Sequence, residues 1–142
     1  MKVPGTLLTT LLNHARDGYP LEVCGVLLGR RILGVRWVEE VVAVPNREPE
    51  SPQVRYQIAP EDVIRIQREA REAGREILGY YHSHPDHPAQ PSETDRQLAA
   101  DGISDGVLHL IVGVERGRAI ETTAWVFEDE TGVFVEEPVA VE

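Results

Sequence analysis

The segment His82-Ser83-His84-Pro85, followed by Ser92-Glu93-Thr94-Asp95, is the most informative part of this chain. Apolar residues 77–81 lead into it and predict a short strand that runs into the histidines. Side chains at positions i and i+2 of a strand point to the same face, so His82 and His84 can reach one metal ion together. Asp95 can add a third ligand and leave a fourth position open for water, which is the arrangement of a catalytic zinc site. These residues therefore predict a zinc hydrolase with His82, His84 and Asp95 as candidate ligands.

Ser92 and Asp95 also fit a second interpretation. A serine followed three residues later by an acid is typical of a helix start, with Ser92 as the N-cap of a helix over residues 92–100. The two interpretations are compatible, because an aspartate in the first helical turn can face the strand end from which the histidines project. The positive end of the helix dipole also keeps such a carboxylate ionised, as a metal ligand must be.

A hydrolytic metal site also needs a general base, and the HExxH helix of common zinc proteases is absent. Glu22 is the candidate, because it is the only acid in the apolar run of residues 21–28, where a charge is costly without a partner or a task. The alternative is an exposed acid at a strand edge. Cys24 shares the strand alternation with Glu22. We interpret Cys24 as a small buried hydrophobe, with a role near the metal as the alternative.

Composition limits the class of protein. The 142 residues fit one domain, and 42% hydrophobic residues are enough for an ordinary core. A net charge of −10 argues against nucleic acid as a partner, since binding phosphates needs a basic face. Polar residues interrupt the N-terminal leucines too soon for a signal peptide or a membrane span. The single cysteine excludes an internal disulfide and a four-cysteine zinc site, so we expect a cytoplasmic protein.

The expected order of elements is α-β-β-α-β-α-β-β-β, which describes an α/β fold with a mixed sheet packed against helices. Expected helices cover residues 4–17, 61–73 and 92–100, and expected strands cover residues 23–28, 35–44, 77–81, 107–114, 119–127 and 133–141. Residues 45–60 are the one irregular, proline-rich segment. The candidate ligands fall where a strand ends and a helix begins, the usual place for ligands in open α/β sheets.

The motifs also have a specific order and spacing: Glu22 with Cys24-Gly25, then His82-Ser83-His84, seven residues, and Ser92-x-x-Asp95. This combined pattern closely resembles the signature of the JAMM (MPN+) metalloprotease family. The resemblance implies one domain of JAMM/MPN (cytidine-deaminase-like) architecture over residues 1–142, and one Zn²⁺ per chain held by His82, His84 and Asp95. It also implies that Glu22 acts as general base and proton shuttle and that Ser92 helps hold the oxyanion.

The resemblance also implies a substrate. Compact prokaryotic members of the family look like peptidases that act at the C-terminal Gly-Gly of ubiquitin-like proteins, especially sulfur carriers. This chain is similar to them in having little room after Asp95 for the insertion of ubiquitin-specific members. The implied bond joins a carrier's C-terminal glycine to a small amino acid or to a lysine side chain. We expect residues 45–58 to pair with the extended tail of that substrate. Nucleic acid and membrane are not expected partners.

Two other interpretations remain open. Family relatives that lack the ligands act as scaffolds in larger complexes, so a non-catalytic binding module is the first. The run from His82 to His87 also fits H-x-H-x-D-H, the pattern of the metallo-β-lactamase superfamily. That superfamily needs a longer chain and further ligands downstream, whereas the only later histidine here is His109, which we expect in the core or facing the pleat. Asp86 and His87 are then expected to be loop residues beside the substrate groove.

Overall fold

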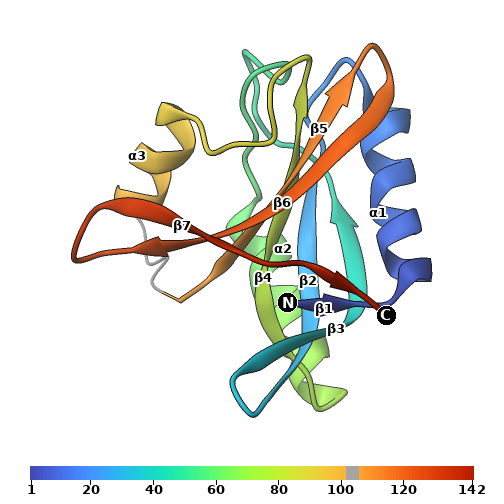
Figure 1. Ribbon diagram of the computed structural model, residues 1–142, viewed down its shortest axis with the longest axis vertical. Coiled ribbons are helices and arrows are strands. Elements are labelled where there is room, and N and C mark those ends of the chain that lie inside the picture. Colours follow the sequence, from blue (N-terminus) through green and yellow to red (C-terminus); the bar gives the residue numbers. More distant parts are fainter. Residues whose placement is uncertain (102–105) are drawn as a thin grey trace.

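The computed structural model describes residues 1–101 and 106–142, without the side chains of residues 101 and 120. Within these residues three helices surround one eight-stranded sheet of order β7-β6-β5-β4-β2-β3-β1-β8 (Figure 1). The helices are α1 (Gly5–Gly18), α2 (Pro60–Glu72) and α3 (Glu93–Asp101). The strands are β1 (Lys2–Val3), β2 (Cys24–Ile32), β3 (Val35–Val44), β4 (Glu76–Pro85), β5 (Leu108–Glu115), β6 (Arg118–Glu128), β7 (Val133–Glu137) and β8 (Ala140–Val141).

The sheet is mixed, so the predicted fold class is confirmed. β4 and β5 are parallel, as are the pairs that β1 forms with β3 and β8, and the remaining neighbours are antiparallel. α3 lies in the crossover between the parallel strands β4 and β5, as such connections require. In the described part of the chain, no helix is both long and apolar enough to cross a membrane.

The two long helices cover opposite faces of the sheet (Figure 1). Leu11 and Ala15 of α1 belong to a core cluster with Leu27 of β2, whereas Ile66 and Ala70 of α2 belong to a second cluster with other β2 residues. Alternate side chains of a strand point to opposite faces, which explains how β2 contributes to both clusters. Burying one large aliphatic side chain is worth about 1.5–3 kcal/mol. The strands at the centre of the sheet are therefore firmly held, and they are the strands that carry the candidate site.

Several boundaries differ from the predictions for local reasons. β4 continues to Pro85, so the histidines lie inside the strand. β2 continues to Ile32 because the hairpin turn needs only Leu33 and Gly34, both with positive φ. The expected last strand is divided into β7 and β8 around Pro138, which has no N–H for a ladder. β1 and β8 pair with each other, and two-residue strands of this kind leave no periodic pattern in a sequence.

Candidate metal centre

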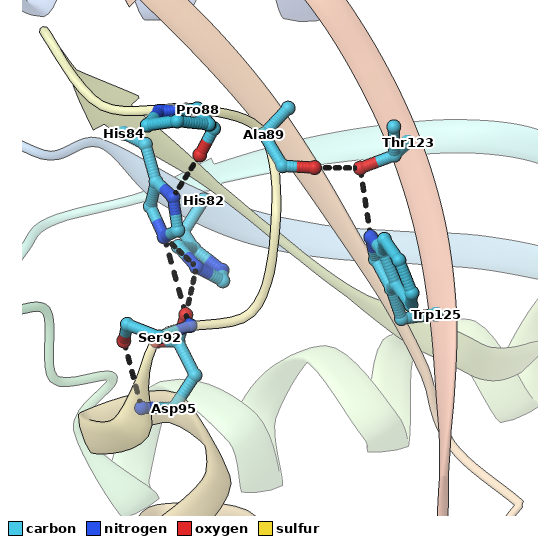
Figure 2. Close-up of polar contacts among 8 residues, drawn as sticks. All are labelled: His82, His84, Pro88, Ala89, Ser92, Asp95, Thr123 and Trp125. Atoms are coloured by element: carbon cyan, nitrogen blue, oxygen red, sulfur yellow. Dashed lines mark hydrogen bonds and ion pairs between the residues drawn. The ribbon is translucent and has the colours of Figure 1, made fainter. Parts of the chain in front are cut away.

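His82 and His84 converge with Asp95, which lies in the first turn of α3 (Figure 2). The Nε2 atoms of the two histidines are 3.1 Å apart. Oδ2 of Asp95 is 3.1 Å from Nε2 of His84 and 3.4 Å from Nε2 of His82. The histidines are 1% and 6% exposed, so they do not face open solvent as loop residues would. The expected convergence of the i and i+2 imidazoles is confirmed.

Ser92 and Asp95 hold each other at the start of α3 while Asp95 faces the histidines (Figure 2). The backbone N–H of Asp95 donates to Oγ of Ser92 at 3.0 Å, and the backbone N–H of Ser92 donates to Oδ2 of Asp95 at 2.9 Å. This is the reciprocal pattern of a capping box, here closed by an aspartate. The geometry is compatible with both interpretations of these residues, because one carboxylate oxygen contacts the helix start and the imidazoles together.

The atoms of this cluster fit a divalent cation. Nδ1 of His84 is 2.8 Å from the Pro88 carbonyl, so this nitrogen carries a hydrogen and, in the neutral ring, Nε2 presents a lone pair to Asp95. A lone pair and a carboxylate oxygen 3.1 Å apart repel each other unless a proton or a metal ion lies between them. In a tetrahedral site with metal–ligand distances of about 2.0–2.1 Å, the ligand atoms lie about 3.3 Å from one another. The three distances among the two Nε2 atoms and Oδ2 of Asp95 are close to this value. Two imidazole nitrogens and one carboxylate oxygen are also ligand types that zinc accepts.

The environment sets the charge of each group. Burial alone would raise the pKa of Asp95, but hydrogen bonds from both histidines and from the Ser92 backbone hold it well below its usual range. Burial lowers the pKa of His82 despite its bond to Asp95. Burial also acts to lower the pKa of His84, but the bonds to Asp95 and the Pro88 carbonyl outweigh it and raise that pKa. Asp95 is therefore ionised and His82 neutral at neutral pH, the forms that bind a metal ion.

Glu22 precedes β2 and borders the same point. One of its carboxylate oxygens lies within 4.8 Å of a ring nitrogen of His82 and of His84, so these three residues form a second possible ligand set. The side chain of Glu22 is only 5% exposed, so the alternative of an exposed strand-edge acid is wrong. Burial raises its pKa to about 8, with Asp95 adding to the shift and His84 opposing it. A carboxyl group tuned in this way can accept and return protons near neutral pH.

Ser83, the residue between the histidines, ties Glu22 to β4. Its Oγ accepts the backbone N–H of Val23 at 2.9 Å, and its own N–H donates to the Val23 carbonyl at 3.1 Å. Val23 directly follows Glu22, so these two bonds fix the distance between the acid and the imidazoles. The sequence motifs alone do not predict this role of Ser83. The available signal was a hydroxyl residue on the opposite face of a strand from two candidate ligands.

A cavity of about 390 Å³ opens onto the cluster, and its lining includes Glu22, His84 and Ser92. His87 also lines this cavity, as expected for a residue beside the substrate groove. Asp86 is turned elsewhere, since its carboxylate accepts the Tyr19 hydroxyl at 2.6 Å and the Arg116 backbone N–H at 2.9 Å. The H-x-H-x-D-H ligand set of the metallo-β-lactamase interpretation is therefore not assembled.

Two other candidate residues take structural positions. Cys24 is fully buried, and its Sγ is 3.7 Å from the Val44 carbonyl. Burial raises the pKa of the Cys24 thiol to about 12, which agrees with its interpretation as a small buried hydrophobe. His109 lies on β5 with its ring edge-on to Phe134, and burial lowers its pKa to about 4. His109 thus belongs to the packing of the sheet, as expected.

The loop between β4 and α3 is held in place from β6 (Figure 2). The Thr123 hydroxyl donates to the carbonyl of the fully buried Ala89 at 2.5 Å, and Nε1 of Trp125 donates to Oγ1 of Thr123 at 2.8 Å. Ala89 follows Pro88, whose carbonyl orients the His84 ring. The His84 imidazole is thus oriented through backbone groups. Residue types in a sequence do not reveal such groups.

The buried Glu22 carboxyl predicts a pH-dependent stability in metal-free protein. Because its folded-state pKa lies above the ordinary value of 4.5, its favourable contribution is complete below about pH 4.5 and is lost as the pH rises through about 8. We expect Glu22→Gln to raise Tm relative to the parent protein by several degrees more at about pH 9 than at about pH 5. One pKa unit corresponds to about 1.4 kcal/mol, and 1 kcal/mol shifts Tm by about 2–4 °C in a domain somewhat larger than this one.

Thermal unfolding of chelator-treated protein, followed by circular dichroism across this range, measures the effect. Groups that do not interact with Glu22, such as His109, cancel in the difference between parent and variant. A difference in Tm that stays constant with pH would show that Glu22 titrates normally in the folded chain.

Comparison with known proteins identifies the family. The model of the prokaryotic homologs of the JAB domain matches residues 4–128, which include Glu22 and the whole cluster. The chain belongs to this family. The resemblance to JAMM (MPN+) proteins seen in the motifs is thereby confirmed, because their elements and spacing lie inside the matched region.

Three curated relatives are similar to the chain over different lengths. A desampylase of Haloferax volcanii is 40% identical over 95 residues, which are 64% of this chain and 66% of the relative. A probable TtuB-protein conjugate cleaving protease of Thermus thermophilus is 36% identical over 93 residues, 66% of this chain and 59% of the relative. The matches thus span less than two thirds of these two relatives. A CysO-cysteine peptidase of Mycobacterium tuberculosis is 31% identical over 135 residues, 95% of this chain and 86% of the relative.

Solved structures agree with the JAB assignment. A protein of Desulfitobacterium hafniense superposes with a TM-score of 0.85 at 29% identity, over 99% of this chain and 92% of that chain. A JAB1/MPN domain protein from Archaeoglobus fulgidus superposes with a TM-score of 0.60 at 24% identity, over 99% of both chains. The second likeness concerns the fold alone and confirms the expected MPN architecture.

Proposed function

We propose that this chain is a zinc-dependent peptidase or isopeptidase that hydrolyses the bond after the C-terminal Gly-Gly of a ubiquitin-like sulfur-carrier protein. The observation that carries the proposal is the contact of one partly buried carboxylate oxygen with two buried imidazole nitrogens, with a second carboxyl group beside them. The names of two relatives support the substrate class. One is named for cleaving conjugates between TtuB and proteins, and the other is named a CysO-cysteine peptidase. We place the activity in the cytoplasm, in keeping with one free, buried cysteine.

In this proposal His82, His84 and Asp95 hold the metal ion. When bound, zinc supplies Lewis-acid chemistry, which activates water and polarises a carbonyl group. Asp95 suits the ligand role better than Glu22, because its Oδ2 touches both imidazoles and its pKa lies below the usual range. The capping bonds with Ser92 hold that carboxylate in place before any metal binds.

Glu22 is the proposed general base and acid. Two carboxyl groups whose surroundings push their pKa values apart are suited to different tasks, and here Asp95 is ionised while the pKa of Glu22 is raised to about 8. Glu22 takes a proton from the attacking water as the water oxygen bonds to the carbonyl carbon. It then returns that proton to the nitrogen of the leaving amine as the C–N bond breaks. General acid–base catalysis of this kind contributes about 10²–10⁴-fold.

Ser92 is the proposed donor to the oxyanion. Its Oγ already accepts the N–H of Asp95, so its own hydroxyl hydrogen remains available for a substrate oxygen. The Ser92 side chain lines the cavity beside His84 and Glu22, where the scissile carbonyl would lie. A hydroxyl donor directed at developing negative charge stabilises the transition state more than the ground state.

The substrate tail is proposed to enter along residues 45–58. Val54 of this segment lines the cavity together with Glu22 and His84, which brings the segment to the reacting bond. An extended Gly-Gly tail has no side chains to obstruct a narrow approach, and backbone bonding supplies affinity for such tails.

Mass spectrometry of carrier proteins extended beyond Gly-Gly tests the proposal. Zinc-loaded protein is expected to trim such a carrier to a product that ends in glycine, both from a linear peptide extension and from a lysine isopeptide. A carrier ending in Gly-Ala is the matched control and is expected to react far more slowly. Intact carriers across a broad panel would exclude this substrate class and favour the scaffold interpretation.

A further inference from the structure

Residues 46–57, the loop between β3 and α2, contact the candidate site at two separate points. We call this segment the Asn46 loop. One contact is made by the Asn46 side chain and the Pro52 carbonyl, and both reach the backbone of Glu22. The other contact is made by the Tyr56 ring, which lies on the ring of His82. One loop therefore touches the proposed base and a proposed metal ligand.

The Asn46 carboxamide makes four hydrogen bonds. Its Nδ2 donates to the carbonyls of Glu22 and Arg55, each at 3.0 Å. Its Oδ1 accepts the backbone N–H groups of Glu48 and Gln57, each at 3.0 Å. A primary amide has two donor hydrogens and two acceptor lone pairs, so every hydrogen-bonding position of the side chain is used. Asn46 thus closes the two ends of the loop on each other and joins them to Glu22.

Glu22 is consequently held on both sides of its backbone. Its carbonyl accepts from Asn46, and its N–H donates to the Pro52 carbonyl at 2.7 Å. Glu22 precedes β2 and therefore receives no support from the ladder that fixes the next residues. The loop supplies the missing backbone bonds at the residue that carries the base.

Tyr56 supports His82, which has an unusual environment for a metal ligand. Nδ1 of His82 is buried and has no hydrogen-bond partner in the part of the chain that the structure describes. The second nitrogen of a ligating imidazole normally donates to a carboxylate, carbonyl or water that sets the ring orientation, as the Pro88 carbonyl does for His84. The Tyr56 ring is stacked on His82, with centroids 4.4 Å apart and an interplanar angle of 21°. This stack restrains the orientation of the ring where a hydrogen bond is missing.

We propose that the Asn46 loop orients Glu22 through Asn46 and the His82 ring through Tyr56, so that Asn46 and Tyr56 are positioning residues of the hydrolytic site. The proposal rests on the proposed function for its catalytic part. Its metal-binding part is independent of turnover. The backbone N–H groups of Arg47, Glu48 and Gln57 already donate to acceptors within the loop. These three groups are therefore not free to pair with a substrate tail.

Kinetics of Asn46 variants test the first contact. Asn46→Asp preserves size and both acceptor bonds but cannot donate to Glu22, and Asn46→Ala removes all four bonds. Both are expected to lower kcat by about 10–100-fold, since small displacements of catalytic groups have effects of this size. KM should change by less than about 3-fold if the loop positions the base rather than the substrate. Gln67→Ala changes an exposed side chain of α2, outside the proposed substrate segment, and is the control, which should leave both constants unchanged.

Metal affinity of Tyr56 variants tests the second contact without any substrate. Tyr56→Leu removes the stacked ring, and Tyr56→Phe keeps it and removes only the hydroxyl. Competition with a chelator is expected to show zinc affinity about 10-fold weaker in Tyr56→Leu than in the parent. This is the lower end of the effect of losing a group that supports a metal ligand. The affinity of Tyr56→Phe should lie within about 2-fold of the parent. The visible spectrum of the cobalt-substituted protein should change in Tyr56→Leu and be restored in Tyr56→Phe.

Three results would overturn the inference. An Asn46→Asp variant with unchanged kcat would remove the positioning role of Asn46, and a raised KM alone would leave the loop only its proposed contact with the substrate. Equal zinc affinity in the parent and Tyr56→Leu would show that the stacked ring does not support His82. If Tyr56→Phe loses as much zinc affinity as Tyr56→Leu, the support comes from the hydroxyl and not from the ring. If no carrier is cleaved by the parent protein, the proposed function fails, while the Tyr56 measurement still decides the metal-binding part.

Discussion

Glu22→Gln is expected to lower kcat by at least ~10²-fold, because an amide can neither take the proton of the attacking water nor deliver it to the leaving amine. The substitution keeps the size of the side chain, the backbone bonds of Glu22 to Pro52 and Asn46, and the bonds between Val23 and Ser83. The zinc content should therefore remain that of the parent protein. Single-turnover cleavage of a carrier extended beyond Gly-Gly, with metal analysis of the same sample, measures both quantities.

The control for this experiment is Glu115→Gln, which neutralises an exposed acid at the end of β5 and should leave kcat unchanged. A Glu22→Gln variant that retains turnover would contradict the proposed base. Loss of zinc in this variant would instead assign Glu22 to the ligand set that it forms with His82 and His84. A parent protein without turnover would favour the scaffold interpretation.

The same residue links activity to stability. Burying the Glu22 carboxyl is unfavourable for its ionised form, as its raised pKa shows. An amide of the same shape avoids that cost, so Glu22→Gln should be more stable at high pH and much less active at every pH. Proteins often keep such a destabilising group only where the chemistry requires it. Opposite effects of one substitution on Tm and kcat would therefore be strong support for a catalytic role, which neither effect provides alone.

The cluster was predictable because its pattern is local. His82 and His84 share a face through strand alternation, and the spacing of Ser92 and Asp95 is that of a helix start. The burial of Glu22 followed from an isolated charge in an apolar run. What brings Glu22 to the histidines is the pairing of β2 with β4, in which Cys24 lies opposite His82, and this register is a property of the tertiary fold.

The supporting residues were not predictable for the same reason. Tyr56 and Asn46 lie in a proline-rich loop without periodicity, and their partners are distant in sequence. Pro88 acts through a backbone carbonyl, which any residue type could supply. Residue identity therefore reveals groups that react or bind metal, while groups that orient them become visible only when the chain is folded. The short strand β1 was missed, and β8 was predicted only as the end of one longer strand, because their pairing depends on distant parts of the chain.

Asp95→Ala is expected to weaken zinc affinity by more than about 100-fold, beyond the range for residues that only support a ligand. The carboxylate Oδ2 lies 3.1 and 3.4 Å from the two imidazole nitrogens, so its loss leaves two ligands and no negative charge. Asp95→Asn should lose affinity to a similar degree, because a neutral amide oxygen is a much weaker zinc ligand than a carboxylate. Chelator competition on each purified variant gives the affinities.

The pair of variants separates the two tasks of this residue. The side-chain amide introduced by Asp95→Asn would still accept the Ser92 N–H and close the helix start, whereas alanine would not. Metal-free Asp95→Ala should therefore be about 1 kcal/mol less stable than metal-free Asp95→Asn.

His87→Ala changes another residue of the same cavity and should leave zinc affinity unchanged, whereas the H-x-H-x-D-H interpretation requires a large loss of zinc affinity. Zinc binding that survives Asp95→Asn would mean that the capping box is the whole role of Asp95 and that the third ligand is Glu22. The proposed division between ligand and base would then be reversed.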